Sequence, residues 1–415
     1  MNSHGLKRRL LPGRYVSSAT RPRSGDGQHA HTPTVLFVDQ SGELGGAEFA
    51  LLPLAAACAA RSEVVLLADG PFRGRLEASG VRVQVLNDAR VSNIDREALR
   101  LNWLYAAPAI IRQVCAIAQQ ARRFDVLFLN TQKALVLGAL GKPLHRRQVV
   151  WYLHDIMSRD HFGRVQLMIV RLLARHVADR IIVNSSASAQ ALIELTGLPA
   201  SAMPVVHNGI DASVFTQLDA GDLPALRRRL GLPETAWLAG LFGRLAPWKG
   251  QHIAIDALPE LPHVHLVLVG GALFGEDAYE AQLREQAQRL GVADRVHFAG
   301  FRDDMAAWMK AMDVILHTST ESEPFGRVVI EGMAAARPVI ATGAGGVMEI
   351  VRHLENGWLV RPRDVAGLVE AIETLRTTPE LGQRLAAQAC ADVQRHFTLD
   401  RYLQQMTDVI DHARR

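Results

Sequence analysis

Short runs of β-branched residues alternate with longer helical patterns along most of the chain. In the first half, six of these runs are expected to be strands, at Val35–Asp39, Val64–Ala68, Val81–Leu86, Val126–Asn130, Val149–Leu153 and Ile181–Asn184. Helical patterns lie between them, for example at Glu48–Ala60, Leu101–Arg123 and Val165–Ala178. Because parallel neighbours are joined by crossover helices, this alternation predicts an α/β fold with a parallel sheet covered on both faces.

A second series of the same kind begins after the polar stretch Thr216–Leu223. Its expected strands are Trp237–Phe242, Val264–Val269, Val296–Phe298, Val314–His317, Val339–Ala341 and Trp358–Val360, and helical patterns follow at Val365–Thr377, Leu381–Phe397 and Asp400–Ala413. The chain has 415 residues, enough for two domains, and two β/α series predict two doubly wound domains with a cleft between them. The expected boundaries are a tail at 1–33, domains at 34–212 and 213–398, and a closing segment at 399–415.

The net charge of +4 is unevenly distributed. Residues 1–34 carry six Lys or Arg and one Asp, a charge of +5, so the other 381 residues together carry −1. The tail is rich in Ser, Gly, Pro and Arg and is expected to be disordered, and Leu10-Leu11 is too short an apolar run for a secretory signal. A nearly neutral body gives no indication of a nucleic-acid partner.

The three cysteines give no sign of a disulfide framework or a metal site. Cys58, Cys115 and Cys390 are far apart and odd in number, with no pair at metal or redox spacing. We expect buried thiols in a reducing compartment, which favours a cytoplasmic location. Phe49–Ala60, an apolar run of twelve residues that contains Pro53, is shorter than the roughly 20 residues that a spanning helix needs.

Ligands of open α/β sheets bind beyond the carboxyl ends of the strands, so the loops there are the candidate sites. The loop Gly243–Gly250 follows the strand Trp237–Phe242 and contains Arg244 and Lys249. A guanidinium fork and an ammonium group in one loop suit a diphosphate. The alternative is a solvated turn with two surface charges.

A second loop, Thr318–Arg327, precedes an expected helix at Val328–Ala336. Pro324 is expected in the first turn of that helix, and free backbone amides there would form an anion site. Glu323 and Glu331 are eight residues apart, on the order of 10 Å at the rise of a helix, which suits a sugar and a ribose at the two ends of a diphosphate. The alternative for Glu323 is a carboxylate that complements the helix dipole; Glu331, on an otherwise apolar helix, is expected to have a partner.

Three further loops stand at strand ends. Thr342–Glu349 is rich in glycine but departs from the dinucleotide pattern at Met348, and we expect its amides and carboxylate to contribute to the same cleft. Gly45-Gly46 opens a helix and allows close approach of a ligand to the backbone, the alternative being a flexible turn capped by Glu48. His154 follows the strand Val149–Leu153, a position that distinguishes it from the other histidines.

Together these loops resemble glycosyltransferase family 4, retaining nucleotide-sugar transferases of the two-domain GT-B fold. The resemblance covers roughly residues 34–412 and is most specific between Asp313 and Val360. The matching segments are Gly45–Glu48, His154-Asp155, Val206–Asp211, Gly243–Gly250, Glu323–Glu331 and Gly345–Glu349. It implies two Rossmann-like domains, the first for the acceptor and the second for the donor, with a C-terminal helix that crosses back to the first domain.

The resemblance also implies roles for individual residues. Arg244 and Lys249 would hold the donor diphosphate, Glu323 the sugar hydroxyls and Glu331 the ribose, while His154 would lie beside the anomeric carbon. The other donor-binding residues that it implies are Gly45, Gly46, Phe301, Phe325, Gly326, Arg327 and Val328. It implies no metal and no resident cofactor, the nucleotide-diphosphate sugar being a co-substrate.

The expected activity is transfer of a hexose to a glycan, lipid-linked or small-molecule hydroxyl, in polysaccharide or glycoconjugate biosynthesis. A nucleotide-sugar epimerase of the same fold and a non-catalytic nucleotide-sugar-binding protein remain alternatives; a glycoside hydrolase and an oxidoreductase fit the motifs less well. Arginines recur with apolar residues along Arg159–Ala178, which is typical of a helix in peripheral contact with the cytoplasmic face of a membrane. A core helix with a solvated basic face is the alternative.

Overall fold

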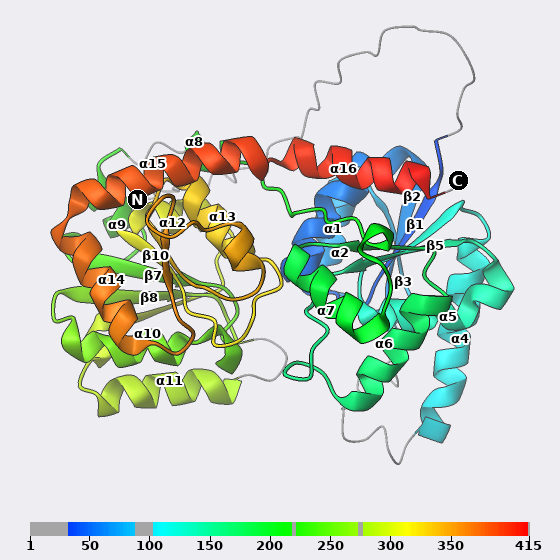
Figure 1. Cartoon of the computed structure of the whole chain (residues 1–415), viewed down its shortest axis with the longest axis horizontal. Helices are drawn as coiled ribbons and strands as arrows, with labels where there is room; N and C mark the ends of the chain where they lie inside the picture. Colours follow the sequence, from blue (N-terminus) through cyan, green and yellow to red (C-terminus); the bar gives the residue numbers. More distant parts are fainter. Residues whose placement is uncertain (1–31, 88–102, 218–220, 273–276, 414–415) are drawn as a thin grey trace, which may run out of the picture.

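The protein is described here by a computed structural model that covers residues 32–87, 103–217, 221–272 and 277–413. Two parallel sheets, each with helices on both faces, form two bodies side by side (Figure 1). They are called the first and second domain below. The expected disordered tail at 1–33 falls almost wholly outside the described residues.

The first domain is built on a six-stranded sheet in the order β3-β2-β1-β4-β5-β6. Its strands are β1 (Val35–Asp39), β2 (Ser62–Leu66), β3 (Arg82–Val85), β4 (Val126–Leu129), β5 (Gln148–Leu153) and β6 (Arg180–Val183). All neighbours are parallel, as in the register Val35 opposite Ser62 and Val126. The order reverses between β1 and β4, so a crevice opens beyond the carboxyl ends of these two strands.

Helices cover both faces of this sheet. One face carries α1 (Gly46–Ala57), α2 (Pro71–Ala78) and the C-terminal α16 (Leu399–His412). The other carries α4 (Trp103–Ala121), α5 (Gln132–His145), α6 (Arg164–His176) and α7 (Ser186–Thr196). The central strands are apolar throughout because side chains on both faces are buried, for example in β1.

The second domain repeats this plan in the order β12-β11-β10-β7-β8-β9. Its strands are β7 (Trp237–Phe242), β8 (Val264–Val269), β9 (Val296–Gly300), β10 (Val314–His317), β11 (Val339–Thr342) and β12 (Trp358–Val360). One face carries α8 (Ser213–Thr216), α9 (Leu223–Arg229), α12 (Met305–Ala311), α13 (Arg327–Ala334) and α15 (Pro379–His396), and the other carries α10 (Gln251–Ala257), α11 (Asp277–Arg289) and α14 (Val365–Thr377). The strand order reverses between β7 and β10.

The chain crosses between the domains at two places that are hydrogen-bonded to each other. The Ile210 amide donates to the Phe397 carbonyl at 2.9 Å, and the Leu399 amide donates to the Ile210 carbonyl at 2.9 Å. After the second crossing α16 packs on α1, where Tyr402 is buried and its hydroxyl donates to the Ala50 carbonyl at 2.9 Å (Figure 1). The predicted architecture of two doubly wound domains with a returning C-terminal helix is confirmed.

Two local expectations were wrong. The helix expected at Val328–Ala336 runs from Arg327 to Ala334 and stops where Ala336 adopts a positive φ of 54°. Pro324 therefore lies before that helix rather than in its first turn. The cysteines are not uniformly buried: Cys58 is buried, Cys390 is half-buried and Cys115 is exposed on α4.

Candidate active site

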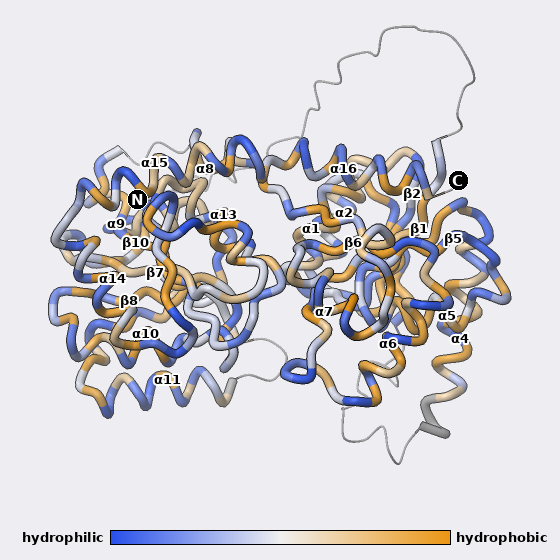
Figure 2. The backbone as a smooth tube through the Cα atoms, viewed as in Figure 1, coloured by the Kyte–Doolittle hydropathy of each residue, from blue (hydrophilic) through white to orange (hydrophobic). Residues whose placement is uncertain are grey.

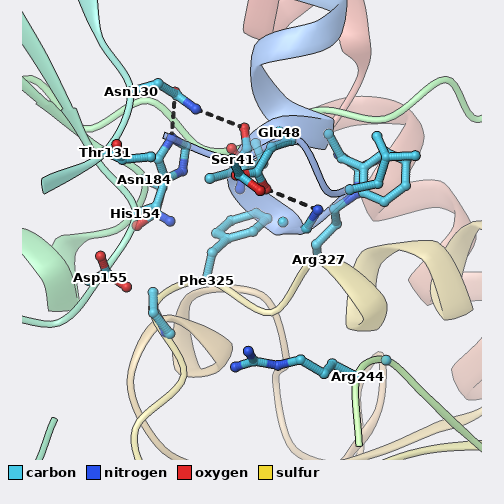
Figure 3. Close-up of a pocket in the computed structure, with 18 of the residues that line it drawn as sticks. Ser41, Glu48, Asn130, Thr131, His154, Asp155, Asn184, Arg244, Phe325 and Arg327 are labelled. Carbon is cyan, nitrogen blue, oxygen red and sulfur yellow. Dashed lines mark hydrogen bonds between the residues drawn. The ribbon is translucent and has the colours of Figure 1, made fainter. Parts of the chain in front are cut away.

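A cleft of about 3830 Å³ lies between the two domains, beyond the carboxyl ends of β1, β4, β7 and β10. Both points at which strand order reverses therefore open into it. The twelve residues predicted to be catalytic or donor-binding all line this cleft: Gly45, Gly46, His154, Arg244, Lys249, Phe301, Glu323, Phe325, Gly326, Arg327, Val328 and Glu331. Figure 3 labels His154, Arg244, Phe325 and Arg327 among them. The structure brings the candidate residues together; their roles stay predictions.

Lys249 and Glu323 form a mostly buried ion pair on the second-domain side of the cleft. Lys249 ends the 3₁₀ turn η4 (Pro247–Lys249), and its Nζ lies 2.9 and 2.7 Å from the two Glu323 oxygens. Ser319 Oγ also donates to Glu323 Oε2 at 3.0 Å. Burial alone would raise the pKa of Glu323, but the Lys249 charge and contacts with His317 outweigh it and hold the pKa well below its ordinary value. Glu323 is therefore an anion held in one place.

Arg244 and Phe301 enter the cleft from neighbouring loops of the second domain. Arg244 follows β7, and its side chain extends toward the space below Phe325 (Figure 3). Its carbonyl accepts a 2.9 Å hydrogen bond from the Gln251 side-chain amide, which ties the loop to α10. Phe301 lies between β9 and α12, is 56% exposed and lines the cleft, so it offers an exposed apolar ring there.

Gly326 sets the start of helix α13 at the cleft. Its φ of 100° is in the left-handed region, which a residue with a Cβ rarely adopts. The chain thereby turns from the Glu323-Pro324 loop into the helix within three residues. The free backbone amides of the first turn of α13 therefore lie at the cleft, because Arg327 and Val328, the first two residues of the helix, both line it.

Glu331 has the partner that its position called for. Arg327, one turn earlier on α13, donates from Nε to Glu331 Oε1 at 2.7 Å. The Arg327 guanidinium also lies 5.1 Å from the centre of the Phe49 ring on α1. Arg327 therefore has a side-chain function that the sequence did not indicate: it holds Glu331 and contacts the first domain at once.

Glu48 caps the glycine turn at the start of α1. Its Oε2 accepts the Gly45 amide hydrogen at 2.9 Å, and the side chain is buried. Burial, and then the nearby negative charge of Asp39, raise the pKa of Glu48 to about 8. The carboxyl is thus protonated at neutral pH, and the Gly45-Gly46 turn presents no anion to the cleft.

His154 lies at the end of a row of hydrogen-bonded side chains that the sequence did not reveal. Asn130, at the end of β4, donates from Nδ2 to Asp39 Oδ2 at 2.6 Å and to the Ala47 carbonyl at 3.3 Å. The Asn130 Oδ1 atom lies 2.9 Å from His154 Nε2 (Figure 3). Asp39 ends β1 and Asn130 directly follows β4, on the two strands where the strand order reverses, so their positions were a signal for finding them.

These hydrogen bonds fix the tautomer of His154. The Asn130 amide group donates to Asp39 and to the Ala47 carbonyl, so the Asn130 atom that faces the imidazole is Oδ1. Because Oδ1 can only accept, His154 Nε2 must carry the hydrogen and donate it. Burial lowers the pKa of His154 to about 3. The ring is therefore neutral at physiological pH, with its proton on Nε2.

The glycine-rich loop after β11 does not line the cleft, contrary to expectation. Gly345 has a φ of 65°, and a Cβ there would lie 2.2 Å from the Glu323 carbonyl oxygen, so the glycine serves close packing against the Glu323 loop. Glu349 points to the first domain instead, where it accepts the amides of Ser186 and Ala187 at the start of α7 at 2.9 and 3.0 Å. The loop supports the site from behind and joins the domains.

Further polar contacts connect the two domains. The Glu349 carboxylate also lies 2.9 Å from His207 Nε2, next to the first chain crossing. Burial would raise the pKa of Glu349, but its hydrogen bonds with His207 and with the α7 amides outweigh burial and lower the pKa. His161 Nδ1 and Glu321 Oε2 are 3.0 Å apart across the cleft. Arg75 and Asp303 form an ion pair at another edge of the cleft. The described arrangement is therefore held by specific contacts on several sides.

Comparison with known proteins assigns the chain to a family. Residues 44–214 match the family described as Glycosyltransferase Family 4, and residues 222–391 match Glycosyl transferases group 1. HepE from Anabaena, whose crystal structure contains UDP and glucose, is 39% identical, and the alignment covers 91% of this chain and 99% of HepE with a TM-score of 0.83. The chain belongs to glycosyltransferase family 4. A second HepE structure, in complex with UDP-glucose, is 38% identical over 92% of this glycosyltransferase with the same TM-score.

Other relatives of this family 4 glycosyltransferase match over less of their length or at lower identity. D-inositol 3-phosphate glycosyltransferases from Thermomonospora curvata and Mycolicibacterium smegmatis are each 33% identical, over 250 and 229 residues. The matched part covers 56% and 54% of this chain and 58% and 52% of those relatives, so the chain spans about half the length of the curated relatives it matches. Sucrose-phosphate synthase from Thermosynechococcus elongatus, 22% identical with a TM-score of 0.77, shares the fold.

Proposed function

We propose that this family 4 glycosyltransferase transfers a hexose from a UDP sugar to an acceptor hydroxyl with retention of anomeric configuration. One observation carries the proposal. Arg244, Lys249, Glu323 and Glu331 lie along one cleft opposite His154, in a chain 38% identical to a protein that holds UDP-glucose. Family membership favours transfer over the epimerase, hydrolase and oxidoreductase alternatives.

The proposed donor site follows the order of these groups along the second domain. Glu331, held by Arg327, would accept hydrogen bonds from the ribose hydroxyls, and Phe301 would stack on the base. Arg244, Lys249 and the N-terminus of α13 would bind the diphosphate. Glu323 would accept from the hexose hydroxyls, because its carboxylate is already ionised and oriented by Lys249.

The proposed reaction breaks the bond between the anomeric carbon and the β-phosphate oxygen and forms one to the acceptor oxygen on the same face of the sugar. Negative charge develops on the departing phosphate, where the fixed charges of Arg244 and Lys249 stabilise it. The departing phosphate oxygen takes the proton of the acceptor hydroxyl. His154, neutral in this structure, would add no positive charge beside the oxocarbenium-like carbon.

No metal is part of this proposal, because Arg244 and the N-terminal amides of α13 would stabilise the phosphate charge together with Lys249, whose ammonium group also neutralises Glu323. Within the described ranges, no group of three or more His, Cys, Asp or Glu side chains is arranged to hold a metal ion. Transfer activity should therefore survive treatment with a chelator. Loss of transfer that added Mg²⁺ or Mn²⁺ restores would contradict this part of the proposal.

The donor proposal is tested with a panel of UDP-, GDP-, ADP- and TDP-hexoses. A UDP-hexose should raise the melting temperature most, and Lys249→Ala and Glu331→Ala should abolish this stabilisation and lower turnover at least a hundredfold with the fold intact. The matched control is Glu370→Ala, which removes an exposed carboxylate from α14. Unchanged turnover in both cleft variants, or an inverted product by nuclear magnetic resonance, would refute the assignment.

A further inference from the structure

Three consecutive helices on one face of the first sheet have an unusual charge pattern. Helices α4, α5 and α6 contain six basic residues and no Asp or Glu, although acidic residues are about as frequent as basic ones in the whole chain. The basic residues are Arg112, Lys133, Lys142, Arg164, Arg171 and Arg175. Lys142 is paired with Asp179 outside these helices, and the residues of the three helices themselves carry positive charge while the body of the protein is nearly neutral.

Helix α6 has two apolar stripes, of which only one is covered. Leu167, Val170 and Ala174 are buried against the sheet. On the opposite side, four large apolar side chains face solvent with exposed fractions of 68, 55, 38 and 51%: Val165, Met168, Ile169 and Leu172. Their spacing, i, i+3, i+4 and i+7, places them in one row along the helix, called the α6 ridge below. Packing against the sheet accounts for the buried stripe. It does not account for the α6 ridge, which is a row of large apolar side chains exposed to solvent.

A row of arginines runs beside the α6 ridge. Arg164, Arg171 and Arg175 recur at i, i+7 and i+11 and are exposed. Arg175 Nη1 donates to the Thr196 carbonyl at 2.6 Å, and none of the three forms an ion pair with a carboxylate in the part of the chain that the structure describes. Their positive charge is thus available to an external anion.

The α6 ridge is continuous with the first-domain side of the cleft. Val165 and Ile169 of the ridge line the cleft, as does Leu140 of α5, which is also exposed. Gln166 of α6 donates to the Gln132 side chain at the start of α5 at 2.9 Å, so the two helices are tied together there. Figure 2 shows hydrophobic segments on α4, α5 and α6 at the end of the first domain away from α16.

We propose that the α6 ridge docks the first domain on an anionic lipid bilayer, which makes the acceptor of this glycosyltransferase a lipid-linked one. The ridge would enter the interface between headgroups and acyl chains while the arginine row contacts acidic headgroups. The cleft mouth would then open at the bilayer surface. The contact proposed is a peripheral one. No helix in the described ranges is long and apolar enough to cross a membrane. The part concerning the acceptor rests on the proposed function; the docking itself does not.

Charge favours a bilayer over a second copy of this chain. In a symmetric dimer formed through this face, the same patch of both copies would meet, and the arginine rows would approach each other with no acidic residue on α4, α5 or α6 to compensate them. An anionic bilayer supplies both missing parts, an apolar layer for the ridge and negative charge for the arginines.

The test is flotation of the full chain with vesicles of phosphatidylcholine alone or with 30% phosphatidylglycerol, in 0.1 M salt. We expect binding to the anionic vesicles only, and at least tenfold weaker binding for Met168→Glu/Leu172→Glu and for Arg164→Glu/Arg171→Glu. The matched controls are Met348→Glu, a methionine that is also 55% exposed, and Arg289→Glu on α11, which should bind as the wild type does. Higher salt should weaken the wild type and Met168→Glu/Leu172→Glu but change the arginine variant little.

The basic N-terminal tail is a competing source of binding, so every protein is also tested with Lys7, Arg8 and Arg9 replaced by Ala. The effect of the ridge variants should persist in that background. The proposal is overturned if anionic vesicles do not bind, if binding depends on the tail alone, or if light scattering shows a lipid-free dimer that the ridge variants dissociate. Stabilisation by a UDP sugar is measured without vesicles, so a failure to dock on vesicles would not contradict the donor proposal. Glu331→Ala should lose stabilisation by the UDP sugar and still bind anionic vesicles.

Discussion

Replacement of the buried Glu48 by Gln should stabilise the protein above neutral pH. The Glu48 side chain is only 7% exposed, and burial together with the charge of Asp39 raises its pKa from 4.5 to about 8. Gln keeps an oxygen that can accept the Gly45 amide hydrogen, so Glu48→Gln retains the cap of α1 and removes only the titration. The change therefore isolates the free energy of ionising this buried carboxyl.

The sign and size follow from the shift in the pKa of Glu48. Between pH 4.5 and about 8 the unfolded chain releases the proton while the folded protein keeps it, so the free energy of unfolding falls as the pH rises. Each pKa unit corresponds to about 1.4 kcal/mol, so about 3 kcal/mol should be lost between pH 5.5 and pH 8. The Gln variant lacks this loss. For a domain of this size, the difference corresponds to about 6–12 °C in melting temperature.

Scanning calorimetry of the wild type and Glu48→Gln at half-unit steps from pH 5.5 to 9 measures the effect. The two melting curves should lie close together at pH 5.5 and separate progressively up to pH 8, with the variant more stable. Glu285→Gln, at an exposed position of α11, is the control and should follow the wild type throughout. Parallel profiles of wild type and Glu48→Gln would show that the pKa of Glu48 is not raised in the folded protein.

Three other changes test the supports of the cleft. Asn130→Leu leaves the buried Asp39 carboxylate without one donor and His154 Nε2 without its acceptor, so the free energy of unfolding should fall by about 1–3 kcal/mol. Turnover at saturating donor should fall by more than this loss of stability explains, and Asn130→Gln should restore part of it. Glu349→Ala removes the acceptor for the α7 amides and should lower stability by about 1–2 kcal/mol and expand the molecule in small-angle X-ray scattering. Gly345→Ala should lower the melting temperature more than Gly221→Ala, since only at Gly345 would the new Cβ meet backbone at 2.2 Å; equal effects would contradict the packing argument.

The strands could be predicted closely because each is a short apolar run bounded by polar or flexible residues. Val35–Asp39, Trp237–Phe242 and Val264–Val269 have the bounds expected from the sequence. A strand buried on both faces must be apolar throughout, so its ends are marked where the first polar side chains appear. In each sheet the parallel order then brings the carboxyl ends of the strands to one edge, which is why the residues predicted to be catalytic or donor-binding line one cleft.

Side-chain partners could not be predicted in the same way. Asn130 and Asp39 are 91 residues apart, and Glu349 contacts α7 more than 160 residues away. Such contacts depend on the order of strands in the sheet and on how the domains approach each other, and neither is written in the local pattern. The loop after β11 shows the consequence: its glycines suggested contact with a ligand, whereas they permit backbone to pack on backbone behind Glu323.

Three glutamates that the motifs place at the cleft are each neutralised by a different means. Glu323 is paired with Lys249, and Glu331 with Arg327. Glu48 has no cation as partner in its described contacts and keeps its proton at neutral pH because burial and a neighbouring carboxyl raise its pKa. A diphosphate would be repelled by any of these groups left as an isolated anion. Whether an anionic donor can enter the cleft therefore depends on how each of these carboxylates is neutralised locally. The net charge of the chain gives no information on this.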